Sequence, residues 1–101
     1  MEKDIQPLSV ELTIDAQEDI RNIYSFIEID SQKYALILVQ QFLEIFEKLK
    51  EFPNLGKNSR LKFESYPNIK EIRHKNYRIF YTINTNKIIV LNIIHSSRNK
   101  I

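Results

Sequence analysis

The sequence predicts an α+β fold with an N-terminal strand, an antiparallel helical hairpin and then a three-stranded antiparallel meander, the helices packing on one face of the sheet. Three observations predict it: residues 8–14 alternate apolar and polar, residues 15–52 hold two apolar stripes at helical spacing, and three strand-like runs follow residue 68. A chain of 101 residues is the length of a single domain, 1–101, built around one core.

The first strand and the helical hairpin follow from local signals. "LSVELTI" at 8–14 has the period of a half-buried strand. Asp15, with Glu18 three residues later, resembles a capping box and predicts a helix that ends near residue 29. Ser31 can cap a second helix, which should end before Pro53 because proline disfavours helical geometry in the preceding residue. The break between the helices is short, so we expect them to be antiparallel.

The second half of the chain reads as strands. Residues 57–68 form a polar, basic connection that could hold a short extra strand. The strands of the meander are predicted at 69–74, 77–84 and 88–95. "NTNK" at 84–87 suits a hairpin turn, because Asn tolerates the left-handed conformation that such turns need.

Alternation along each strand sorts the side chains onto two faces of the sheet. The set expected to face the helices from the middle strand is Tyr77, Ile79, Tyr81 and Ile83. The opposite face is expected to be open and to carry a polar cluster with one aromatic: Glu71, Arg73, Arg78, Phe80 and Asn92. In the last strand the outer set is expected to be Ile88, Val90, Asn92 and Ile94, which places Ile89, Leu91, Ile93 and His95 on the helix side.

Several apolar residues lie off the main stripes of the two helices: Phe26, Ile29, Leu36, Ile37 and Ile45. We expect core packing to account for most of them, with a surface for a partner protein as the alternative.

Charge is unevenly distributed between the halves of the chain. Residues 1–50 carry ten acidic and five basic side chains, whereas residues 51–101 carry three acidic and ten basic ones. This split indicates that one face meets an anionic partner, either nucleic acid or an acidic protein, with chance clustering as the alternative.

Composition excludes several classes of function. The chain has no cysteine, which excludes disulfides and thiolate chemistry, and with only two histidines neither a metal nor another cofactor is expected. The N-terminus, "MEKDIQPLSV", lacks the apolar region of a signal peptide. No apolar run approaches the roughly 20 residues that span a bilayer, so we expect a cytoplasmic protein.

The predicted open face could cleave RNA by activating a 2′-hydroxyl, a reaction that needs a base, an acid and cations near phosphorus. Glu71 or His95 could be the base, although a lone histidine at a strand end is more often structural. Phe80 or a nearby tyrosine could stack on a nucleobase. The cations available are Arg73, Arg78 and Arg98. The non-enzymatic alternative is a docking surface for a partner's helix or an added strand.

The chain resembles toxins of the RelE/ParE superfamily, the small toxins of type II toxin–antitoxin operons, from about residue 10 to 99. The resemblance rests on "AQEDIRNIYSFI", "FPNLGK", "IKEIRHKNYRIFYTI" and "IIVLNIIHSSRN". Its most characteristic pieces are the Tyr77–Arg78 pair and the terminal His95-x-x-Arg98. The resemblance implies a cytoplasmic, growth-inhibiting toxin that is neutralised by a cognate antitoxin, and that with the antitoxin could bind operator DNA.

The resemblance leaves the target open. ParE-like members inhibit DNA gyrase, and the long helical hairpin, "FPNLGK" and the short "HSSRN" ending resemble them more closely. RelE-like members cleave mRNA on the ribosome without a metal, and in that case the resemblance implies a catalytic set of Arg78, Arg98, His95, Glu71 and Arg73. Where RelE has a lysine in the preceding strand, this chain has Glu71 or Ile69. A degenerate toxin that only binds its antitoxin is the third alternative.

Overall fold

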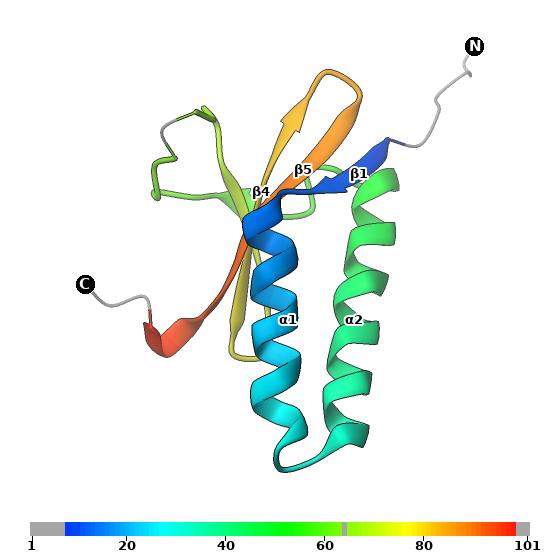
Figure 1. Ribbon diagram of the computed structural model, residues 1–101. Helices are drawn as coiled ribbons and strands as arrows, with labels where there is room; N and C mark the ends of the chain where they lie inside the picture. Colours follow the sequence, from blue (N-terminus) through cyan, green and yellow to red (C-terminus); the bar gives the residue numbers. More distant parts are fainter. Residues whose placement is uncertain (1–7, 64, 99–101) are drawn as a thin grey trace.

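The computed structural model describes residues 8–63 and 65–98, and it confirms the predicted α+β fold (Figure 1). The elements in chain order are β1 (Ser9–Leu12), α1 (Ile14–Glu28), α2 (Gln32–Glu51), β2 (Lys57–Asn58), β3 (Lys70–His74), β4 (Tyr77–Asn84), β5 (Lys87–His95) and the short 3-10 helix η1 (Ser96–Arg98). The helices α1 and α2 lie side by side as an antiparallel hairpin against the sheet (Figure 1).

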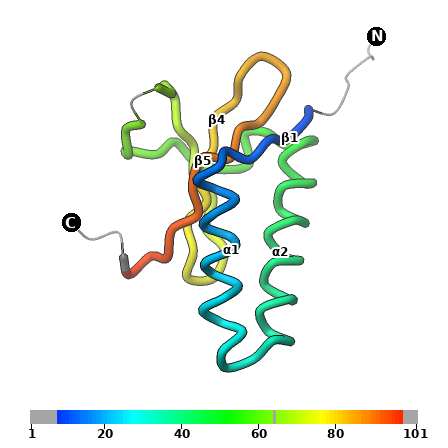
Figure 2. Tube along the Cα trace, viewed as in Figure 1, coloured from blue at the N-terminus to red at the C-terminus, as the bar shows by residue number. Residues whose placement is uncertain are grey.

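One five-stranded sheet holds all the strands, in the order β1-β5-β4-β3-β2. The meander β3-β4-β5 is antiparallel as predicted, and β2 is the short extra strand that the 57–68 connection had room for. β1 pairs with β5 in parallel over residues 9–12, so the remainder of β5 runs beyond the end of its neighbour. This free part of β5 lies beside α1 (Figure 2).

One of the two predicted helix caps is confirmed and the other is wrong. Ser31 caps α2 as predicted. The prediction that Asp15 caps α1 was wrong, because the strand ends earlier than expected and Thr13 takes that position. The Thr13 hydroxyl accepts a hydrogen bond from the Ala16 amide at 3.0 Å and donates one to the Leu91 carbonyl at 2.9 Å. One side chain therefore both starts α1 and ties it to β5.

The main core lies between the helices and the sheet. It contains the predicted stripe of β4, in which Ile79 and Tyr81 are fully buried while Tyr77 and Ile83 pack at its margin. The buried members from α1 and α2 are Ala16, Leu38, Phe42, Phe46 and Leu49.

The outer face of the sheet was expected to be open, and this prediction was wrong for part of it. A second, smaller core of Ile69, Phe80 and Leu91 lies on that face. The segment between β2 and β3 covers it, and the side chains packed there are Leu61, Phe63 and Tyr66. This segment lies on the side of the sheet away from the helices (Figure 2). Only the part of the outer face toward His74 and His95 remains uncovered by it.

A bulge in β5 explains where alternation failed in the last strand. Phe80 lies opposite Asn92 and Tyr81 opposite Val90, so Leu91 has no partner in β4. An extra residue of this kind reverses the faces of everything on one side of it.

The predicted faces of β5 were consequently wrong before the bulge and right after it. Ile88 and Val90 lie in the helix-side core, not on the outer face. Ile89 and Leu91 pack on the outer side, not against the helices. The residues after the bulge follow the prediction: Asn92 and Ile94 on the outer side, Ile93 and His95 on the helix side.

The helical hairpin exposes much of its apolar surface. Core packing was expected for most of the residues off the main stripes, and this was wrong for four of the five: Phe26, Ile29, Leu36 and Ile37 are exposed. Ile45 packs against the core as expected. In the part of the chain that the structure describes, neither helix has the length and hydrophobicity of a membrane span.

Candidate functional site

An ion pair between β3 and β4 lies on the outer face of the sheet. The Arg78 Nε donates to the Glu71 Oε2 at 3.1 Å, and the Arg78 Nη2 donates to the Glu71 Oε1 at 2.9 Å. The two residues are diagonal neighbours, because Glu71 lies opposite Phe80 and Arg78 opposite Arg73. Their side chains are 6% and 19% exposed, which makes this a largely buried, two-pronged pair.

The pair fixes the protonation of its carboxylate. Hydrogen bonding from Arg78 is the main reason that the pKa of Glu71 lies below its ordinary value, and it outweighs burial, which acts in the opposite direction. The same hydrogen bond raises the pKa of Arg78. A general base works best with a pKa near the operating pH and a free lone pair. Glu71 has a lowered pKa and both of its oxygens already accept from Arg78, so it is poorly suited to the role of base.

Phe80 lies beneath the arginine. The Arg78 guanidinium carbon is 5.0 Å from the centre of the Phe80 ring, a cation–π distance. Phe80 is fully buried, and the Phe63 ring covers it with a centroid distance of 6.0 Å. The expectation that Phe80 stacks on a nucleobase was therefore wrong, because the segment between β2 and β3 occupies that position.

Arg73 is the exposed cation of this face. It lies directly opposite Arg78, and its Nη1 donates to the Ser96 hydroxyl at 2.9 Å. Within residues 8–63 and 65–98 it has no carboxylate partner. Two arginines side by side, one of them unneutralised, form a local positive patch that suits an anion.

His95 lies on the other side of the sheet from this pair. It is opposite Tyr77, and the two rings meet edge to face with centroids 5.1 Å apart. Its Nδ1 accepts from the Ser97 amide at 3.2 Å and lies 2.8 Å from the Ser97 hydroxyl. A cavity of about 210 Å³ between α1 and the end of β5 is lined by His95, Asp19, Phe26 and other residues. His95 is thus a packed strand-end residue, and the sheet separates it from Arg78.

The remaining members of the predicted site are placed as follows. Arg98 ends η1, and its side chain lies outside the described part of the chain. Asn92 lies in the part of β5 that extends beyond the end of β1. Its side-chain amide donates to the Asp19 Oδ2 at 3.0 Å. The site therefore brings together Glu71, Arg73 and Arg78 and leaves His95 out.

Sequence reasoning missed two features. Asp19 holds the free edge of β5, since its Oδ2 also accepts from the Ile93 amide at 2.9 Å, and no local pattern marks a residue for that role. The second feature is a concavity over the outer face with Arg60 and Lys62 among its lining residues. The run of cations in "KNSRLK" at 57–62 was a signal for it, but no local pattern indicates that the segment folds back over the sheet.

The chain belongs to the ParE toxin family: the model of the ParE toxin of the type II toxin–antitoxin system parDE matches residues 10–100. It is thus the toxin of a type II toxin–antitoxin system.

Two solved structures share the fold. A chromosomal ParDE toxin–antitoxin system from P. aeruginosa superimposes with a TM-score of 0.68 at 19% identity, covering 87% of this chain and 95% of that one. The toxin–antitoxin complex RelBE2 from Mycobacterium tuberculosis gives a TM-score of 0.60 at 22% identity, covering 88% of this chain and 98% of that one. Among curated protein sequences, none matches this chain.

Proposed function

We propose that this toxin inhibits growth by acting on DNA gyrase, as ParE-like members do, and that a cognate antitoxin neutralises it. The observation that carries the proposal is the locked state of Glu71. Its two oxygens accept from Arg78, its pKa is lowered, and both histidines at this end of the sheet, His74 and His95, pack on the helix side. Among the described residues the outer face thus has cations without a free base, which suits binding better than RNA cleavage. The match to the ParE family supports the same target.

The alternative is a ribosome-dependent mRNA endoribonuclease of the RelE type. One observation favours it: Arg73 and Arg78 lie opposite each other and could hold a phosphate while its charge develops. The nucleophile's proton would then need an acceptor from outside this set, such as the mRNA or the ribosome. Mapping of mRNA ends in a translating extract tests this alternative. Codon-positioned cuts that disappear in Arg78→Ala would establish it and remove the gyrase proposal.

The exposed apolar side chains of the helical hairpin support the antitoxin as a partner. Phe26 is 67% exposed, Ile29 79% and Leu36 55%, and Leu43 lies two turns beyond Leu36 on the same helix. An amphipathic segment of the antitoxin that lies across this surface would bury these residues. Both solved structures that share the fold are of toxin–antitoxin systems, which supports the same partner.

Expression of the chain alone in growing bacteria is the first test. We expect growth arrest, and we expect plasmids isolated from the arrested cells to have lost negative supercoils. Co-expression of the antitoxin should restore growth for the wild type and fail to restore it for Leu36→Asp, because the charge would be buried under the partner. Asn86→Asp, which adds the same charge at an exposed position in the turn between β4 and β5, is the matched control. Unhindered growth of cells expressing the toxin alone would contradict the proposal and leave only antitoxin binding.

A further inference from the structure

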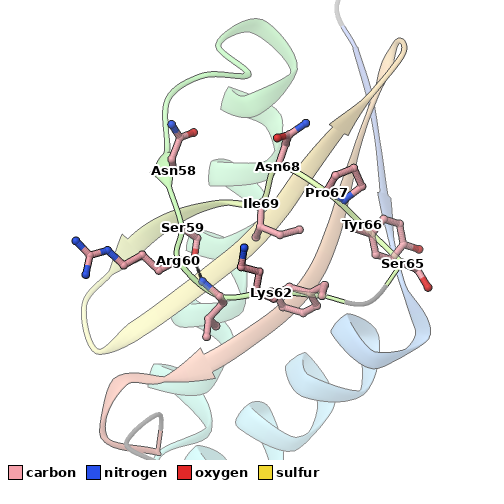
Figure 3. A pocket seen from close by; sticks show the side chains of 11 residues that line it. Asn58, Ser59, Arg60, Lys62, Ser65, Tyr66, Pro67, Asn68 and Ile69 are labelled. Atoms are coloured by element: carbon pink, nitrogen blue, oxygen red, sulfur yellow. Dashed lines mark hydrogen bonds between the residues drawn. The ribbon is translucent and has the colours of Figure 1, made fainter.

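The segment that covers the outer face builds a concavity of about 670 Å³ (Figure 3). It begins at Asn58 in β2 and closes at Ile69, just before β3. The Ser59 amide donates to the Ile69 carbonyl at 2.8 Å, which joins the two ends. The Thr82 hydroxyl of β4 lies 3.2 Å from the Pro67 carbonyl, so the segment is also tied to the sheet beneath it. The concavity is therefore held at its base before any ligand binds.

Two cations, Arg60 and Lys62, are among the residues that line this concavity. Both are exposed, and neither has an ion-pair partner in the described residues. The amino group of Lys62 turns inward, whereas Arg60 extends outward from the rim (Figure 3). The Lys70 amine binds a neutral group, the Asn58 side-chain oxygen, at 3.0 Å.

Glu71, the acidic side chain that the structure describes in this part of the chain, is already paired. From residue 57 to 75 the described chain has six Lys or Arg side chains and a single acidic one, Glu71. Both oxygens of Glu71 accept from Arg78 on the neighbouring strand. The positive charge at the concavity is therefore not neutralised within the described part of the chain, and its field favours a polyanion.

The neutral groups in the lining suit the phosphate backbone of a nucleic acid. Asn58, Ser65 and Asn68 add amide and hydroxyl donors to the cations. Phosphate oxygens of a nucleic-acid backbone accept from this mixture of Lys, Arg, Asn and Ser donors. The half-buried Tyr66 ring lies among them and offers a flat surface to a base. The volume exceeds that of one phosphate group, so a chain of phosphates fits better than a single ion.

We propose that this concavity, with Arg60 and Lys62 as its main cations, binds the phosphodiester backbone of nucleic acid without regard to sequence. It is a contact surface separate from the Arg78–Glu71 pair and from the helical hairpin. The proposal does not depend on gyrase being the target, so its failure leaves the proposed function standing.

Fluorescence anisotropy of labelled oligonucleotides with the purified full-length chain tests it. The probes are a single-stranded oligodeoxythymidine and a mixed-sequence DNA duplex. The protein is titrated into each probe at several salt concentrations, with polyglutamate as a competitor. We expect binding that weakens with salt, with a log–log slope of about −2 on the single strand if three phosphates are neutralised. Comparison of the two probes shows whether the backbone is bound as a strand or as a duplex, and binding of either supports the proposal.

Two double variants with the same change in net charge separate the concavity from general electrostatics. Arg60→Gln/Lys62→Gln removes two cations from the concavity, and Lys33→Gln/Lys48→Gln removes two exposed cations from α2. We expect the first variant to lose about tenfold in affinity and to lower the slope by about 1.4, and the second to bind within about twofold of the wild type. Equal losses in both variants, no loss in the first, no binding by the wild type, or equally good competition by polyglutamate would each overturn the proposal. All four side chains are exposed, so unchanged circular dichroism is expected and confirms that both variants fold.

Discussion

Arg78 and Glu71 face each other diagonally across β4 and β3, and both carboxylate oxygens accept from the same guanidinium. Because Glu71 is almost fully buried, its charge depends mainly on Arg78, with smaller contributions from a Ser59 hydrogen bond and from Lys57. The pair is thus a structural unit of the outer face as well as the centre of its charge. It also decides the chemistry of the face, since it removes the carboxylate best placed to act as a base.

The pair predicts strong energetic coupling between its members. Arg78→Met removes the guanidinium, which is the main partner of Glu71, and we expect it to lower the free energy of unfolding by about 2–3 kcal/mol. Arg78→Met/Glu71→Gln should recover a large part of that loss, because the buried charge is gone. Urea unfolding of the two single variants and the double variant measures the coupling. Losses that simply add would show that the two residues act independently.

Glu71 also predicts how stability depends on pH. Its folded pKa lies below the unfolded value of about 4.5, so the unfolded chain takes up its proton first as the pH falls. The stabilisation is therefore complete well above that value and is lost as the pH falls through the folded pKa. We expect the difference in unfolding free energy between wild type and Glu71→Gln to be constant near neutral pH and to shrink below about 4.5. A difference that grows on acidification would contradict the lowered pKa.

We expect the Asp19 carboxylate to protect the free edge of β5 from amide hydrogen exchange. Its carboxylate accepts from the Ile93 amide, which lies beyond the end of β1 and has no strand neighbour on that side. Asp19→Ala should speed amide hydrogen exchange at Ile93 while Ile79, in the centre of the sheet, keeps its protection. Asp15→Ala, one turn earlier on α1, is the control and should leave Ile93 unchanged. Unaltered exchange at Ile93 in Asp19→Ala would show that the carboxylate does not hold this edge.

Gly56 occupies a position that has no room for a side chain. A Cβ built there would lie 2.6 Å from the Glu71 carbonyl oxygen and 2.8 Å from the Tyr81 hydroxyl, which itself accepts from the Gly56 amide at 2.8 Å. We expect Gly56→Ala to lower the free energy of unfolding by about 1–3 kcal/mol, because the nearest atom belongs to the backbone of β3. Asn54→Ala, two residues earlier and exposed, should change stability by less than about 0.5 kcal/mol. Equal urea midpoints for Gly56→Ala and the wild type would contradict the clash.

The parts of the fold that depend on local chemistry could be predicted from the sequence. Ser31 as a cap, the bounds of β4 and the order of the elements follow from side-chain type and periodicity within a few residues. The bulge at Leu91 could not be predicted, because it arises from the register between two strands. For the same reason the faces of Ile88 and Val90 were predicted wrongly.

The candidate site, like the fold, could be predicted only where it depends on local sequence pattern. Alternation predicted that Glu71, Arg73 and Arg78 share a face, and the structure places them there. It could not predict that Glu71 and Arg78 bind each other, nor that Phe63 covers Phe80, because both depend on contacts between distant segments. Within the described residues, these contacts pair the Glu71 carboxylate with Arg78 and bury the Phe80 ring.

The most direct test of the account is a supercoiling assay with relaxed plasmid, DNA gyrase and the purified toxin, run beside mRNA end mapping in a translating extract. We predict that the toxin blocks supercoiling in a concentration-dependent way and leaves the mRNA intact, because the described outer face has cations but no free base. Full supercoiling at every toxin concentration, with codon-positioned cuts in the mRNA, would contradict the proposal that the toxin acts on gyrase.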